Sequence, residues 1–214
     1  MITPMLLAEA FVLLALDPDG SPARGASNQP AAAIGVTAAL VTELVQQGHI
    51  DLTDGRIHVT GSRPEHPVLI RALDNLAPHE GRKLKARLGS VRHAGWKEVV
   101  DAMVEQGVLG RVRRRMRATR HPVLDGAVQA AVLTEVRAAA AFEQLAGSRT
   151  AALLALAGPS QLLEVVAPER AGRAHARQRI AQAAEQVPAA AAVKYVIDSM
   201  HAVTAGAAAA ANSG

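Results

Sequence analysis

The sequence contains no cysteine and very few aromatic residues, and both absences narrow what the chain can build. Without cysteine it forms neither a disulfide nor a thiolate metal site. Aromatic residues make up only 2% of the 214 residues, whereas strand-rich folds depend on them. The apolar half of the composition is therefore dominated by Ala, Leu, Val and Ile, and helices rich in Ala and Leu pack closely. These features predict a mainly α-helical protein.

The sequence also lacks an apolar run long enough to cross a bilayer. The stretch of 11 residues from 6 to 16 is interrupted by Glu9, whereas a spanning helix needs roughly 20 apolar residues. The basic segment that opens a secretory signal is missing before this stretch. We expect a cytoplasmic protein that associates at most peripherally with the inner face of a membrane.

Recognisable catalytic motifs are missing as well. The sequence has no phosphate-binding loop, nucleophile elbow or dinucleotide-binding turn. Its eight histidines are scattered, and no two of them share helix spacing with a carboxylate as a zinc site requires. Asp17 and Asp19 fit a turn better than general acid–base chemistry. We therefore expect no enzymatic activity, no cofactor and no metal site.

Positive charge is abundant and concentrated in one region. Residues 82–120 hold twelve Lys or Arg and three acids, a net charge of +9, whereas the rest of the chain has eleven basic and sixteen acidic residues, a net charge of −5. Such asymmetry indicates a contact surface for an anionic membrane, a nucleic acid or an acidic protein, although a solvated surface that keeps the protein soluble is the alternative. The candidate anion-binding residues are Arg92, Lys97, Arg111, Arg113, Arg114, Arg115, Arg117 and Arg120.

Local signals predict helices joined by two hairpins. Asp54-Gly55 lies between alternating apolar residues in segment 50–59, which is typical of a two-residue hairpin. The arginine-rich segment 111–120 is the second predicted hairpin. Helices are expected to begin at Thr3-Pro4 and Pro67 and to cover residues 30–48, 80–88, 96–107, 124–146, 149–157, 160–167, 168–186 and 188–204.

The sequence predicts a helix–hairpin–helix unit that occurs twice, because His-Pro-Val-Leu follows each predicted hairpin, at residues 66–69 and 121–124. We expect one domain over residues 1–204 and a disordered Ala/Gly tail over residues 205–214.

Several motifs in order resemble the Golgi phosphoprotein 3 family, which includes many bacterial members. They lie at residues 6–17, 35–50, 104–109 with 121–124, and 153–164. The resemblance implies a mainly α fold, a helical bundle ringed by amphipathic helices with two small β-hairpins. It also implies a non-enzymatic peripheral membrane adaptor that binds phosphatidylinositol 4-phosphate and the cytoplasmic tails of glycosyltransferases.

The chain departs from the headgroup pocket of that family. At the positions of the family's Trp and three Arg, it has Asn28, Thr37, His93 and Trp96. The family hairpin after Gly-Val-Leu has an apolar tip, whereas the one here is arginine-rich. The leading hypothesis is therefore an adaptor whose basic face binds anionic lipid headgroups.

Two alternatives for the basic region are retained. A helix followed by a basic hairpin is also typical of winged-helix nucleic-acid-binding or regulatory proteins, although the acids Glu98, Asp101 and Glu105 on the helix disfavour entry into a DNA groove. The hairpin is also a candidate surface for self-association.

Overall fold

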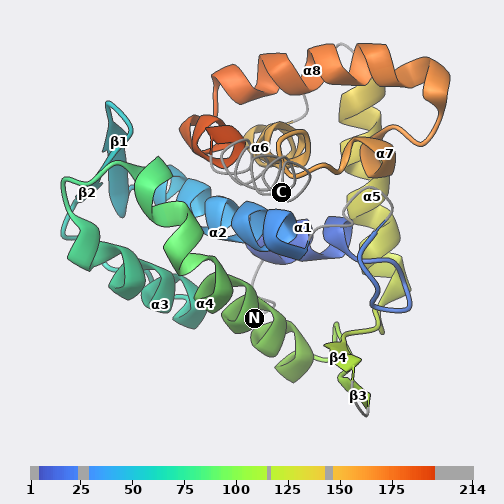
Figure 1. The fold of residues 1–214 in the computed structure, drawn as a ribbon, viewed down its shortest axis with the longest axis horizontal. Coiled ribbons are helices and arrows are strands. Elements are labelled where there is room, and N and C mark those ends of the chain that lie inside the picture. The colour runs from blue at the N-terminus through green and yellow to red at the C-terminus, as the bar shows by residue number, and fades with distance from the viewer. Residues whose placement is uncertain (1–4, 24–28, 115–116, 143–146, 196–214) are drawn as a thin grey trace, which may run out of the picture.

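The structure is a computed structural model that describes residues 5–23, 29–114, 117–142 and 147–195; the side chains of residues 29–30, 89–93, 114 and 117–118 are not described. It is mainly helical with two small antiparallel sheets, which confirms the predicted fold class (Figure 1). The elements are α1 (Leu7–Ala15), α2 (Gln29–Gln46), β1 (Ile50–Thr53), β2 (Arg56–Val59), α3 (Pro67–Leu76), η1 (Ala77–His79), α4 (Leu84–Glu105), β3 (Val112–Arg114), β4 (Arg117–Arg120), α5 (Gly126–Ala141), α6 (Ser148–Ala157), α7 (Leu163–Val166), η2 (Arg170–Gly172) and α8 (Arg173–Glu185).

Helix α1 is the centre of the core. All of its residues are buried, and α2, α4, α5 and α6 contact it. Small residues bring the neighbouring helices close. A methyl group at Gly35 of α2 would lie 2.4 Å from the ring of Phe11 in α1, and one at Gly95 of α4 would lie 2.7 Å from Thr37 Oγ1. Small residues at these crossings thus let the helices pack closely in a core that has few aromatic side chains.

The buried start of α1 needs partners for its backbone amides, and carboxylates supply them. Glu9 accepts a hydrogen bond from the Leu6 amide at 2.8 Å, and Glu43 of α2 accepts one from the Leu7 amide at 2.7 Å. Arg149 of α6 donates to the Leu6 carbonyl at 2.9 Å. The first helix was expected to begin at Thr3-Pro4, but it begins at Leu7 with Leu6 in the capping position, because the Glu9 and Glu43 carboxylates accept the amide hydrogen bonds there.

The first hairpin forms as its sequence predicts. Strands β1 and β2 pair from Ile50 with Val59 to Thr53 with Arg56. Asp54 and Gly55 form the turn with φ of 52° and 68°, the left-handed values that a two-residue turn of this kind requires. The side chain of Ile57 is completely buried, so the hairpin packs one face on the helical core.

Four further predicted helices differ from the structure, and one of them, expected over residues 168–186, begins only at Arg173 after the short η2 turn. The helices expected over residues 80–88 and 96–107 are one continuous helix, α4, because its contact with α2 outweighs the low helix propensity of Gly89 and Gly95. The helix expected over residues 160–167 is shorter, α7, since the chain turns at Gln161, where φ is 65°.

The helix–hairpin–helix order occurs twice, as α2–β1–β2–α3 and as α4–β3–β4–α5. The predicted tail over residues 205–214 lies outside the described residues.

Candidate functional site

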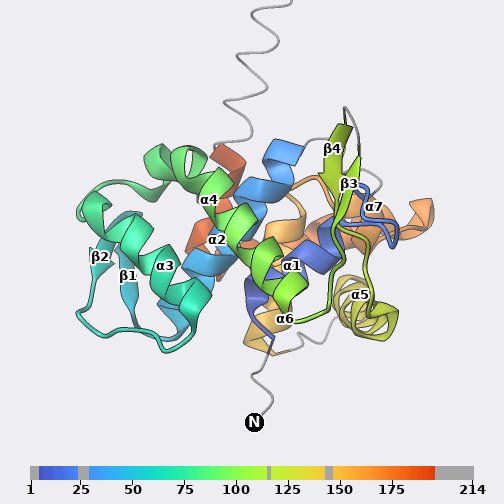
Figure 2. The ribbon, with the colours of Figure 1, turned by 90° about the horizontal axis from the view of Figure 1, so that it is seen from below.

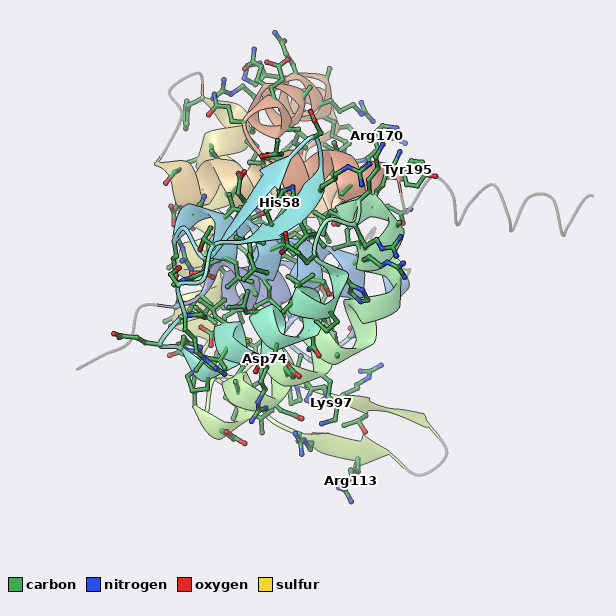
Figure 3. The ribbon with its side chains drawn as sticks, turned by 90° about the vertical axis from the view of Figure 1, so that its left-hand side faces the viewer. His58, Asp74, Lys97, Arg113, Arg170 and Tyr195 are labelled. Atoms are coloured by element: carbon green, nitrogen blue, oxygen red, sulfur yellow. The ribbon has the colours of Figure 1, made fainter. Side chains whose placement is uncertain are left out.

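The arginine-rich hairpin forms an arm that projects from the helical body (Figures 2 and 3). Strands β3 and β4 are antiparallel, and Val112 pairs with Arg120 and Arg114 with Arg117, with an irregular register between the two pairs. The structure therefore confirms the second predicted hairpin. Arg113 is exposed on the arm and forms no ion pair with a described residue (Figure 3).

Backbone hydrogen bonds close the base of the arm and connect it to the loop after α1. The Gly110 amide donates to the Pro122 carbonyl at 2.7 Å, and the Val123 amide donates to the Pro18 carbonyl at 3.0 Å. Gly20 lies against the same segment with φ of 77°, and a methyl group there would come within 2.4 Å of the His121 backbone. The loop after α1 and the base of the arm therefore pack as one unit.

Two acids near the base hold the first and last arginines of the arm. Asp101 of α4 pairs with Arg111 and, at 2.7 Å, with Lys97. The hydrogen bond from Lys97 lowers the pKa of Asp101, although partial burial opposes it. Asp19 pairs with Arg120, and hydrogen bonds from Ser21 lower the pKa of Asp19. Sequence reasoning identified the turn at Asp19 but not its ion pair, which joins residues 101 positions apart.

The structure thus divides the predicted site residues into three groups. Lys97, Arg111 and Arg120 are paired with acids at the base, and Arg113 is exposed farther along the arm. The side chains of Arg92, Arg114, Arg115 and Arg117 lie outside the described part of the chain.

The basic region of the sequence occupies two places in the fold. Arg82, Lys83 and Lys85 are exposed around the start of α4, whereas the arm follows the other end of this 22-residue helix, a length of about 33 Å. Lys85 Nζ lies 4.4 Å from the centre of the Tyr195 ring. In Figure 3, Tyr195 and the arm lie toward the same side of the molecule. The single basic region expected from the sequence therefore forms two clusters, one at the start of α4 and one on the arm, and both lie toward the same side of the molecule.

Between these clusters, α2 crosses α4 at the positions where the resembled family has its headgroup pocket. The Thr37 side chain is 5% exposed, and its hydroxyl donates to the Ala33 carbonyl at 3.0 Å. Trp96 is partly buried against the core. Asn28 and the side chain of His93 lie outside the described residues. Thr37 and Trp96 thus serve helix packing here and supply no cation.

The chain belongs to the Golgi phosphoprotein 3 (GPP34) family, whose model matches residues 7–200. No curated protein sequence matches it. Within the described residues, no helix is both long and apolar enough to traverse a bilayer.

Proposed function

We propose that the protein is a non-enzymatic adaptor that binds anionic lipid headgroups at a membrane surface through the arm. The observation that carries this proposal is the position of Arg113 on a projecting hairpin whose base is fixed by backbone hydrogen bonds. An arm held in this way presents charge to a flat surface with little loss of conformational freedom on binding.

The arm and the start of α4 act together in this proposal. Each basic side chain near an anionic bilayer contributes about 1 kcal/mol, so several are needed for measurable binding. Two clusters separated by the length of α4 and facing one side also favour one orientation of the protein on the surface. The absence of a cation at Thr37 and Trp96 favours charge-driven adhesion over recognition of one phosphoinositide.

Co-sedimentation with vesicles tests the proposal. Wild-type protein is expected to bind vesicles containing phosphatidylserine or phosphatidylinositol 4-phosphate and not to bind neutral vesicles. Binding is expected to weaken as the salt concentration rises. The double substitution Arg113→Glu/Arg114→Glu reverses two charges on the arm and is expected to abolish this binding. The matched control, Arg63→Glu/Arg71→Glu, changes the net charge equally on exposed residues before and within α3, which lies lower in Figure 2 than β3 and β4.

Equal loss of binding in both variants would show that net charge matters and the arm does not, which contradicts the proposal. Wild-type protein that ignores anionic vesicles at low salt but binds duplex DNA with a steep salt dependence would favour the nucleic-acid alternative.

A further inference from the structure

A polar pocket of about 680 Å³ lies at the start of α1, within the size range of small-molecule sites. Four parts of the chain contribute ionisable side chains to it: the end of α2, the connection to β1, the connection between β2 and α3, and the start of α6. These side chains are Glu43, His49, Arg63, Glu65, His66 and Arg149. Charged groups of both signs therefore converge from segments that are far apart in the sequence.

Glu43 and Arg149 are anchored to the fold. Glu43 is only 9% exposed, and its carboxylate accepts from the Leu7 amide at 2.7 Å. The Arg149 guanidinium donates to the Leu6 carbonyl at 2.9 Å, which takes one of its five N–H donors, and it forms no ion pair with a carboxylate of the described residues. Because backbone atoms hold both side chains, they are oriented before any ligand arrives.

The rim of the pocket adds one donor and two exposed charges. His66 Nδ1 accepts from the Val68 amide at 3.2 Å, so the neutral ring carries its proton on Nε2 and presents a donor there. Arg63 pairs with Asp74 at 3.5 Å, but their side chains are 69% and 60% exposed, and such pairs contribute little. Arg63 is therefore available for a stronger partner, and Glu65, two positions later, is exposed as well.

The balance of charges indicates the class of ligand. Two arginines favour a carboxylate or phosphate group, because a guanidinium donates two parallel hydrogen bonds to either. Two glutamates offer acceptors to an ammonium group. We propose that this pocket binds a small soluble zwitterion that carries an oxyanion at one end and an ammonium group at the other.

The location of the pocket favours a soluble ligand over a lipid headgroup. In Figure 2 the first turn of α1 and the start of α6 lie toward the lower edge, whereas β3 and β4 point to the upper edge. A molecule that rests on a membrane through the arm therefore turns this pocket toward the surrounding solution.

Calorimetric titration with O-phosphoethanolamine, O-phosphoserine and the common free amino acids tests the inference. We expect at least one of them to bind more tightly than inorganic phosphate or ethanolamine, which each carry only one of the two charges. Arg149→Gln is expected to weaken that binding by about tenfold, the loss typical of a charged hydrogen bond. Arg63→Gln and Glu65→Gln change only exposed rim residues, so the fold is retained, and each is expected to weaken binding about threefold to fivefold.

Arg113→Gln on the arm is the matched control and is expected to leave binding unchanged. Failure of all these compounds to bind at millimolar concentration would overturn the inference, as would binding that the rim substitutions leave unaltered. Binding only to vesicles of phosphatidylethanolamine, and to none of the free compounds, would also refute a soluble ligand. None of these outcomes depends on whether the arm binds anionic membranes.

Discussion

The crossing of α1 and α2 at Gly35 provides the sharpest test of the fold. We predict that Gly35→Ala destabilises the protein, although alanine is the better helix former. A methyl group at this position would lie 2.4 Å from two ring carbons of Phe11 and 2.6 Å from Ser160 Oγ. Both residues are completely buried, so neither side chain can move into solvent.

The expected magnitude follows from two opposing effects. Alanine instead of glycine inside a helix stabilises by about 1 kcal/mol. Overpacking of a dense core costs typically about 1–3 kcal/mol, occasionally more, and the rigid ring of Phe11 places Gly35→Ala at or above the upper end. The net loss is about 2 kcal/mol, which lowers the Tm of a protein of this size by about 4–8 °C.

Denaturant titration and thermal unfolding measure this loss directly. Gly126→Ala is the control, because no atom lies near the added methyl group and its stability should change little. Phe11→Leu should cost about 1–2 kcal/mol alone, yet combined with Gly35→Ala it should relieve the clash, so that the double variant is at least about 1 kcal/mol more stable than the sum of the single effects. Full stability of Gly35→Ala would refute the close approach of the two helices.

Three other predictions concern charged residues. Asp101→Asn should lower the free energy of unfolding by less than about 1 kcal/mol, because its ion pairs are largely exposed. Sedimentation with anionic vesicles should be preserved or increased, because Lys97 and Arg111 are released from Asp101. Weaker sedimentation would mean that these ion pairs orient the arm. Arg179→Met should be neutral or stabilising in denaturant titrations, since the buried guanidinium has no carboxylate partner among the described residues and its Nη2 is left without a hydrogen bond; a loss of several kcal/mol would contradict this. Burial raises the pKa of Glu43, so the folded protein binds the proton of this carboxyl more tightly than the unfolded chain does. The resulting stabilisation is complete below the unfolded-state pKa of Glu43 and is lost as pH rises through its folded-state pKa. Glu43→Gln removes this pH dependence. Between about pH 4 and about pH 7, the free energy of unfolding of the variant should therefore rise relative to that of wild type. A difference in unfolding free energy that is the same at both pH values would show that Glu43 does not cause the pH dependence.

Features set by neighbouring residues could be predicted from the sequence. The turn at Asp54-Gly55 depends on two residues that accept positive φ, and it forms as expected. Helix α3 begins at Pro67, as the proline predicts, and His66 is its cap. The hydrogen bond that the Val68 amide donates to His66 Nδ1 is seen only in the folded structure. The arm was likewise visible as an arginine-rich segment after a helix that ends at a glycine.

Features set by tertiary contacts could not be predicted in this way. Separate helices were expected over residues 80–88 and 96–107, but the contact with α2 keeps α4 continuous through Gly89 and Gly95. Asp19 and Arg120 pair across 101 positions of sequence, which no periodicity reveals. The pocket at the start of α1 depends on Glu43 and Arg149 meeting through the backbone of Leu6 and Leu7, so its signal lies in the fold alone.

The two candidate surfaces share a framework that keeps them apart. Glu9 caps the start of α1 near the pocket and also accepts a hydrogen bond from Gln106, just after α4, at 3.1 Å, a few residues before the arm. This chain of contacts joins the two regions in space, but coupling between sites requires an element with two alternative arrangements. The link consists of a completely buried helix and a 22-residue helix packed against α2, each held by close contacts. A rigid link of this kind fixes the orientation of the pocket relative to the arm without making the occupancy of one depend on the other.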